Sequence, residues 1–438
     1  MEVHFLSRKS IKPSTPTPNH LRTHKLSFFD QLAPRAHVPL LFFYPSDGIS
    51  TTNEKLQKLQ KSLSDTLTLF HPLSGRLLKE DLIVDCSDQG VEFFEAKVNL
   101  TLEEFLSLGP EKLELLDHFV PSDIGFSLLP TTPMVAIQVT FFECGGLVIC
   151  VHASHVINDA FSGITFIQSL ATACRLGIGE VVRPSFDLSL LFPSRDISGE
   201  IVNHPLPNAT GGVKVVTKIF VFDAAKIAEL KDKLIGGSGE DRKPSRVEVV
   251  VSALWKALIL ASRARNEEKL RDSAVSLPVN LRGRTGLQTP ENLMGNFYML
   301  IPTTFEPEQN STEPNHIHLL GLLRESMRKS LATLAKLSDN GEISSAGQNF
   351  HNKVGKSMLD ENVDVLNVTS WCRFPLYETD FGWGKPCWVN GACFPLELVV
   401  LFDTNCGTGI EAWVGLKEPT MLEFEKVPDI LELINSSC

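Results

Sequence analysis

The sequence predicts two α/β domains in which strands and helices form layers. The chain has 438 residues, more than a single hydrophobic core usually organises, so two domains are expected. Strand-like and helical runs alternate in both halves, which is typical of layered α/β folds. Between the halves, residues 183–212 contain four prolines and three glycines. This composition and length favour a crossover linker, so we expect domains at 1–182 and 213–438.

In the first half, two helical patterns flank a group of strand-like runs. Leucines recur near a helical period through 52–69, and that pattern stops at Pro72, because proline cannot continue a helix. A second helical pattern begins near Asp159 and reaches Gly177, a residue type that often ends helices. Runs with strand-like patterning predict four strands between them. These runs are 82–84, 91–94, 134–142 and 147–151.

The second half shows the same mixture of patterns. Apolar residues at helical spacing predict helices at 224–234, 247–261 and 319–337. Dense β-type runs predict strands at 213–222 and 394–402. No internal repeat is present, so a solenoid or an array is disfavoured.

Charge and cysteine usage narrow the class of protein. The net charge of −11 disfavours nucleic acid and anionic membrane surfaces as partners. The nine cysteines are scattered, odd in number and without a C-x-x-C pair, which favours reduced cytosolic thiols over disulfides or a zinc site. The sequence shows no signal peptide and no apolar run long enough to span a bilayer. We therefore expect a cytoplasmic protein.

His155 is the first candidate site residue. It lies between the predicted strand 147–151 and the helix that begins near Asp159, and imidazole is the side chain best suited to take a proton near neutral pH. The H-x-x-x-D spacing alone is weak, and a satisfied core histidine is the simplest alternative. A metal site formed with His152 is disfavoured, because residues three apart at a strand end face opposite sides. No second ligand cluster accompanies these residues, so we expect no metal.

A second cluster lies towards the C-terminus. Asp380-Phe381-Gly382-Trp383-Gly384 places two glycines around a tryptophan, a composition that predicts a tight turn with an aromatic side chain packed nearby. Turns of this kind are usually architectural, so we expect a structural role. The segment Thr369-Ser370-Trp371 precedes it.

With both clusters present, the sequence resembles the plant BAHD acyltransferase family, which is marked by H-x-x-x-D and D-F-G-W-G. Other family-like stretches cover most of the chain; they are 26–30, 71–77, 251–258, 280–284 and 295–296. The resemblance implies two chloramphenicol acetyltransferase-like domains, each a mixed sheet flanked by helices, with a channel between them. A segment near 365–390 is expected to pack back on the N-terminal domain.

The resemblance also implies a mechanism. His155 is expected to deprotonate the acceptor hydroxyl or amine, which then attacks the acyl-CoA thioester directly. Asp159 is expected to brace the loop and to pair with Arg282. Asp380, Gly382, Trp383 and Gly384 are expected to be structural, with Asp380 pairing with Arg284.

Two further assignments combine the resemblance with chemistry. The oxyanion of the tetrahedral intermediate needs a donor, and the Thr369 hydroxyl and the Trp371 indole N–H are donors of the right type. Core filling is the alternative for Trp371. Ser252 and Lys256 lie where the family places contacts to CoA, although a lysine that merely solvates its helix remains an alternative for Lys256.

One departure points to a branch of the family. Many members have glycine after the motif aspartate, whereas this chain has Ala160, which trims the space beside the turn. Ala160 and the run 369–377 are similar to the vinorine synthase-like branch of alkaloid and terpenoid O-acetyltransferases. We therefore expect acetyl-CoA as the co-substrate and an alcohol of a specialised metabolite as the acceptor. The resemblance also implies a monomer with no tightly bound cofactor. A larger donor (benzoyl, tigloyl or hydroxycinnamoyl), an amine acceptor and a catalytically silent binding protein are the alternatives.

Overall fold

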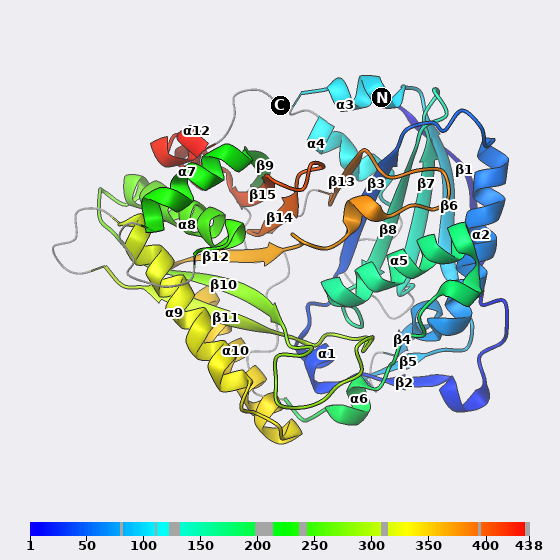
Figure 1. Ribbon diagram of the computed structural model, residues 1–438, viewed down its shortest axis with the longest axis horizontal. Coiled ribbons are helices and arrows are strands. Elements are labelled where there is room, and N and C mark those ends of the chain that lie inside the picture. The colour runs from blue at the N-terminus through cyan, green and yellow to red at the C-terminus, as the bar shows by residue number, and fades with distance from the viewer. Residues whose placement is uncertain are drawn as a thin grey trace. The chain divides into compact units, whose positions relative to one another are not determined.

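The computed structural model describes residues 1–78, 82–109, 112–121, 132–197, 213–235, 243–307, 314–392 and 396–433. They form two compact units, each with a mixed sheet and flanking helices (Figure 1). Unit 1 consists of Met1–Ile197, Thr289–Phe297 and Phe374–Cys393. Unit 2 consists of Ser198–Gln288, Tyr298–Arg373 and Phe394–Cys438. None of the described helices is long and apolar enough to cross a membrane.

Unit 1 is built on a six-stranded sheet in the order β1-β6-β7-β8-β3-β13. Its neighbouring strands are antiparallel except β6 and β7, which are parallel. The strands are β1 (Val3–Ile11), β3 (His37–Tyr44), β6 (Val91–Val98), β7 (Val135–Phe141), β8 (Leu147–Ser154) and β13 (Trp388–Asn390). A smaller three-stranded sheet contains β2 (Thr23–Lys25), β5 (Ile83–Asp85) and β4 (Arg76–Leu78).

Two long helices, α2 (Thr52–Leu69) and α5 (Ala160–Leu176), pack against each other in unit 1 (Figure 1). The helix α2 begins at a capping box formed by Thr51 and Glu54, a pairing that satisfies two otherwise unpaired backbone donors. The shorter helices are α1 (Phe28–Leu32), α3 (Leu102–Ser107), α4 (Lys112–Leu115) and α6 (Leu188–Leu191). The 3-10 helices are η1 (Asn19–Leu21), η2 (His71–Ser74), η3 (Leu116–Phe119), η4 (Ile178–Glu180) and η6 (Leu376–Glu378).

Unit 2 is built on a second six-stranded sheet, in the order β11-β10-β12-β14-β15-β9. The central pairs β10–β12 and β12–β14 are parallel, and the outer pairs are antiparallel. The strands are β9 (Val215–Phe222), β10 (Asp272–Asn280), β11 (Tyr298–Phe305), β12 (Val363–Ser370), β14 (Val399–Asp403) and β15 (Ile410–Lys417). The helices are α7 (Ala224–Ile235), α8 (Arg246–Arg265), α9 (His316–Leu334), α10 (Asn340–Leu359), α11 (Glu418–Phe424) and α12 (Pro428–Leu433).

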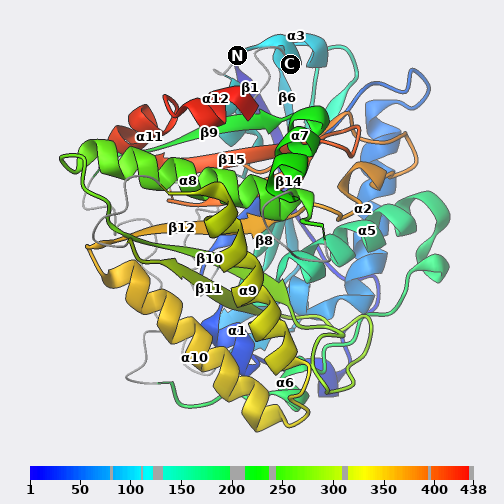
Figure 2. The ribbon, with the colours of Figure 1, turned by 60° about the vertical axis from the view of Figure 1, so that its left-hand side comes forward.

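The core of unit 2 is centred on α8, which lies across the sheet with α9 beside it (Figure 2). Trp255 of this helix is fully buried, and its indole N–H donates to the Ser273 hydroxyl at 2.9 Å. Burying an indole with its donor satisfied keeps the apolar gain without a desolvation cost for the N–H group. The helix is therefore held to β10 by a specific polar contact as well as by apolar packing.

The boundaries of the units differ from those of the predicted linker and the predicted returning segment. Residues 183–197 belong to unit 1, because α6 lies in this stretch and the Phe28 amide donates to the Phe192 carbonyl at 2.8 Å. The remainder of the predicted linker, 198–212, lies outside the described residues. The segment that returns to unit 1 is Phe374–Cys393, whereas 365–373 stays in unit 2. A second returning segment, Thr289–Phe297, is absent from the sequence-based prediction.

Candidate active site

His155 follows directly after β8 in unit 1. The backbone N–H of Ser154 donates to Met134 at 2.8 Å, and that of His155 donates to Ala36 at 2.8 Å. These bonds extend the ladder for one residue past the strand, after which the chain turns towards α5. The imidazole is half-buried in this turn. A side chain presented at a strand-to-helix turn on a rigid sheet suits a positioned base.

The His155 ring is held by Asn296, a residue of the returning segment Thr289–Phe297. Nδ1 of His155 lies 3.1 Å from the carboxamide oxygen of Asn296. The carboxamide nitrogen of Asn296 lies 2.7 Å from the His155 carbonyl oxygen and 2.9 Å from Oδ1 of Asp30. Both the ring and the backbone of His155 therefore contact one side chain.

Asp159 is the N-cap of α5, and both its oxygens accept backbone donors. Oδ1 accepts from the Ser162 amide at 2.8 Å, and Oδ2 accepts from the Phe297 amide at 3.1 Å. N-capping satisfies an otherwise unpaired donor at the helix start. These contacts suit the expected brace of the loop. The predicted pairing with Arg282, a residue of unit 2, stays a prediction.

The environment lowers the pKa of His155. Burial, the main cause, lowers this pKa because it disfavours the charged ring. A backbone hydrogen bond of His155, the side-chain hydrogen bond of Asn296 and the carboxylates of Asp159 and Asp30 raise it by a smaller amount. Desolvation penalises imidazolium, and nearby anions favour it. Because the pKa is lowered overall, the ring is neutral near pH 7 and has a lone pair available to accept a proton.

His152 takes a different place from His155. It lies within β8 with its ring 5.1 Å from that of His37, and both side chains are buried. Burial lowers the pKa of His37 to about 4 and that of His152 to about 3. In the described part of the chain, no group of three metal-ligating side chains is placed to hold an ion.

The Asp380–Gly384 turn contacts Tyr44 of β3 and Lys55 of α2 through its aromatic rings. Oδ1 of Asp380 accepts from the amides of Gly382 and Gly384 at 2.7 and 3.0 Å. The rings of Phe381 and Trp383 stack at 5.5 Å between centroids. These contacts lie within the turn itself, which suits the expected structural role. The predicted pairing of Asp380 with Arg284 of unit 2 stays a prediction.

Thr369 and Trp371 lie at the end of β12 in unit 2. Thr369 pairs in parallel with Val400, and the Trp371 amide donates to Leu401 at 2.8 Å. Both side chains are half-buried, and the indole meets Phe402 edge-on at 5.4 Å. The role of these two residues as oxyanion donors stays a prediction.

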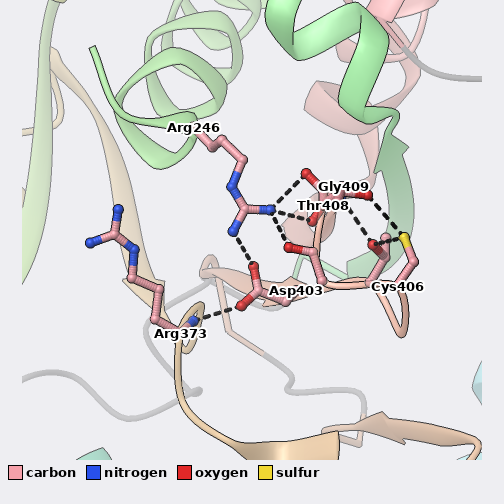
Figure 3. Close-up of polar contacts among 8 residues, drawn as sticks. Arg246, Arg373, Asp403, Cys406, Thr408 and Gly409 are labelled. Carbon is pink, nitrogen blue, oxygen red and sulfur yellow. Dashed lines mark hydrogen bonds and ion pairs between the residues drawn. The ribbon is translucent and has the colours of Figure 1, made fainter. Parts of the chain in front are cut away.

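The turn after Trp371 is fixed by a network absent from the sequence-based prediction (Figure 3). Arg373 has a left-handed backbone with φ of 71°, and its amide donates to Oδ2 of Asp403 at 2.7 Å. Oδ1 of Asp403 accepts from Arg246 at 3.0 Å, and the same guanidinium donates to the carbonyl of Thr408 at 2.6 Å. A non-glycine residue in this region is strained and persists where its surroundings enforce it.

The two residues expected near CoA already have partners in unit 2. Ser252 is buried, and its hydroxyl donates to the Val249 carbonyl of its own helix at 2.8 Å. The ammonium of Lys256 lies 2.6 Å from Asp429, and His316 lies 3.7 Å from the same carboxylate oxygen. A role in binding CoA stays a prediction for both, and it requires these side chains to exchange partners.

Asn296 and Asp30 are the site residues for which sequence reasoning assigned no role. Both fall in stretches that resemble the family, but 266 residues separate them in the chain. No local pattern signals a contact over that distance. The only sequence signal is the Gly295-Asn296 pair, since glycine often marks a close approach of backbone.

Comparisons with known proteins place this geometry in a family. A model of the Transferase family matches residues 1–431. The chain is 37% identical over 449 residues to acetyl-CoA-benzylalcohol acetyltransferase of Clarkia breweri, covering 99% of this chain and 100% of that protein. It is 34% identical over 450 residues to limonoid 1-O-acetyltransferase of Citrus sinensis, covering 98% of each. The crystal structure of vinorine synthase matches with a TM-score of 0.83 at 34% identity, covering 99% of each chain. The chain therefore belongs to the Transferase family of acyl-CoA-dependent acyltransferases, the plant BAHD family.

Proposed function

We propose that this enzyme transfers the acetyl group of acetyl-CoA to a hydroxyl of a plant specialised metabolite, an alkaloid or a terpenoid. The observation that carries the proposal is the half-buried His155, with Nδ1 at the Asn296 carbonyl and its pKa lowered. The names of the relatives support the acetyl donor, and benzyl alcohol and limonoids appear among their acceptors. We further propose that the enzyme acts as a cytoplasmic monomer without a tightly bound cofactor.

In the proposed reaction, Nε2 of His155 removes the proton of the acceptor hydroxyl as the oxygen attacks the thioester carbonyl. The tetrahedral intermediate carries an oxyanion, for which Thr369 and Trp371 are the proposed donors. Collapse of the intermediate breaks the carbon–sulfur bond and gives the acetyl ester. The proton on His155 then passes to the CoA thiolate, so the base is regenerated without an acyl-enzyme.

The test is transfer from acetyl-CoA to a panel of benzyl alcohol, hydroxylated alkaloids and limonoid alcohols, read by mass spectrometry as the gain of one acetyl group. Benzoyl-, tigloyl- and hydroxycinnamoyl-CoA are offered in competition, with one amine acceptor included. We expect an acetyl ester as the main product. A larger acyl group or an amide as the main product would overturn the donor or the acceptor class.

His155→Ala provides the mechanistic arm of this test. Loss of a positioned base lowers the rate by roughly 10²- to 10⁴-fold, so we expect kcat to fall by that factor. His118→Ala is the matched control, because His118 is exposed on η3 of unit 1. Turnover by His155→Ala close to that of the control would refute His155 as the base. Turnover of any substrate excludes a silent binding protein.

A further inference from the structure

The carboxamide of Asn296 is surrounded by acceptors on one side and by an imidazole on the other. Its nitrogen lies 2.9 Å from Oδ1 of Asp30, 2.7 Å from the carbonyl oxygen of His155 and 3.0 Å from that of Val156. Its oxygen lies 3.1 Å from Nδ1 of His155. Asn296 is fully buried, so water does not compete for these contacts.

These neighbours fix the orientation of the amide. All three atoms around its nitrogen are acceptors, and a carboxamide NH2 group supplies two N–H donors. Rotating the amide by 180° would put its oxygen against the same three acceptors and remove the N–H donors that face them. A buried acceptor without a donor costs about 1–3 kcal/mol, so the observed orientation is strongly preferred.

The orientation of the amide in turn fixes the tautomer of His155. The carboxamide oxygen of Asn296 accepts hydrogen bonds and cannot donate one. Nδ1 of His155 must therefore carry the proton in this contact. In a neutral imidazole only one nitrogen is protonated, so Nε2 keeps its lone pair. Asn296 thus selects the form of the ring in which Nε2 is the base.

The carboxylate of Asp30 holds the Asn296 side chain in this orientation. Its carboxylate is buried and accepts four hydrogen bonds: Oδ1 from the amide and carboxamide N–H groups of Asn296, and Oδ2 from the amide and hydroxyl of Ser27. Burying a carboxylate is costly, and burial raises the pKa of Asp30, whereas the hydrogen bonds from Ser27 and Asn296 lower it. Four donors offset part of that cost. A neutral acceptor at this position would attract the Asn296 amide less strongly, since hydrogen bonds to charged groups are about twice as strong.

The backbone that carries Asn296 is fastened on both sides. The Ser162 hydroxyl lies 3.0 Å from both the amide nitrogen and the carbonyl oxygen of Gly295. Asp159 accepts from the Phe297 amide. Gly295 has φ of 110°, and a Cβ there would lie 2.6 Å from a methyl carbon of Leu188. Residues 295–297 are therefore held against α5 and α6, and these contacts position Asn296 beside the His155 ring.

We propose that Asp30 and Asn296 are positioning residues: the Asp30 carboxylate holds the Asn296 amide, and that amide holds His155 in the tautomer with Nδ1 protonated and Nε2 unprotonated. The carboxylate also lies where it favours the imidazolium that forms as His155 takes the acceptor proton. This inference rests on the proposed function of His155 as the general base. It assigns to two buried residues, remote in sequence, the selection of the reactive tautomer.

The first test combines kinetics with nitrogen NMR. Asn296→Ala removes the carboxamide that accepts from Nδ1 of His155. We expect kcat to fall roughly tenfold to hundredfold, the size of losing a hydrogen bond to a group that becomes charged. The KM for acetyl-CoA is expected to stay unchanged. In protein labelled with ¹⁵N-histidine, the wild-type His155 is expected to show a protonated Nδ1 and an unprotonated Nε2. In Asn296→Ala both nitrogens are expected to move towards averaged values. His155→Gln identifies the signals among the twelve histidines.

Asp30→Asn is the second variant, because it keeps the shape of the side chain and removes the charge. We expect a lower kcat and a shift of the acid limb of the pH–rate profile to lower pH, since the anion no longer favours the imidazolium. Asn390→Ala is the matched control: Asn390 is also a fully buried asparagine of unit 1, on β13. We expect it to leave the His155 tautomer and the pH profile unchanged.

The outcomes separate this inference from the proposed function. A folded Asn296→Ala or Asp30→Asn enzyme with wild-type kcat and an unchanged His155 tautomer would overturn the positioning role. If Asn296→Ala does not fold, the kcat, the pH profile and the His155 tautomer of Asp30→Asn alone test the positioning role. The NMR signals are measured without an acceptor substrate. They therefore test whether Asn296 fixes the His155 tautomer even if no tested substrate is turned over. Wild-type turnover by His155→Ala would instead contradict the proposed function.

Discussion

The phenolic hydroxyl of Tyr44 donates to the carbonyl oxygen of Thr379 at 2.9 Å, and both residues are fully buried. This bond joins the end of β3 to the segment that leads into the Asp380–Gly384 turn. The Tyr44 ring also meets Phe381 and Trp383 edge-on. The D-F-G-W-G motif is therefore joined to the sheet of unit 1 through Tyr44, which lies 335 residues before Thr379 in the chain.

Gly384→Ala is expected to destabilise the fold without changing the chemistry. Gly384 has φ of 105°, a conformation that L side chains rarely adopt, although a Cβ would meet no atom within 4 Å. The cost is therefore backbone strain alone, about 1–3 kcal/mol. Urea unfolding measures it. Gly179→Ala is the control, because Gly179 also has open space and lies outside the left-handed region. Equal stability of the two variants would contradict the prediction.

The pH dependence of kcat/KM is expected to show an acid limb set by His155. The base must be neutral, and the pKa of His155 is lowered from its ordinary value of 6.5. Activity should therefore decline at acid pH as the ring gains a proton, with the midpoint of that decline below 6.5. Initial rates in overlapping buffers locate the midpoint. A midpoint above 6.5 would show that the surroundings favour the charged ring.

The stability of the enzyme is expected to fall on acidification because His37 and His152 are buried in neutral form. Their folded-state pKa values are about 4 and 3, against 6.5 for the ordinary group. The unfolded chain therefore binds more protons between about pH 6.5 and 4, and stability present above that window is lost as pH decreases. Each group contributes about 1.4 kcal/mol per pH unit there.

His152→Phe tests this linkage, since it removes one titrating group and keeps an aromatic ring beside His37. The slope of the unfolding free energy against pH is expected to be shallower by about one proton between pH 6 and 4.5. The exposed His118, changed to Phe, serves as the control. An unchanged slope in His152→Phe would show that His152 does not couple acid to unfolding.

Asp403→Asn is expected to loosen the turn that follows Trp371. The change keeps the shape of the side chain but weakens its ion pair with Arg246 and its bond to the Arg373 amide. We expect a loss of about 1 kcal/mol in stability, since the pair is partly exposed, and a lower kcat if Trp371 faces the oxyanion. Asp65→Asn, which breaks an exposed pair with Lys61, is the control. Equal kinetic effects of the two variants would refute a link between the turn and catalysis.

The sequence predicted the elements that carry strong local patterns. The helix 52–69 is found at those bounds, because its leucines form one buried face and Thr51 caps its start. Asp159 lies at the start of α5, as its position before the apolar pattern indicated. The fold class also followed from the family resemblance, and the match to vinorine synthase confirms it.

Other features have no local signal. The central strands β10 and β12 were not predicted, although they are paired with each other. The pattern of β10 is interrupted by Pro278, and half-buried positions alternate weakly along β12. The contacts of Asn296 with Asp30 and His155 join residues that are 266 and 141 positions apart. Such contacts depend on tertiary packing, which periodicity and spacing do not encode.

The returning segments of unit 1 have a consequence for synthesis on the ribosome. A nascent chain grows from its N-terminus, and domains generally fold as units once they have emerged. Unit 1 cannot do so early, because β13, the neighbour of β3, and Asn296 are translated long after His155. Until then the edge of β3 is unpaired, and an open strand edge invites pairing with other chains. The growing chain should therefore depend on chaperones until residue 390 has emerged, and a product that stops before residue 289 should contain the H-x-x-x-D motif without the side chain that orients its histidine.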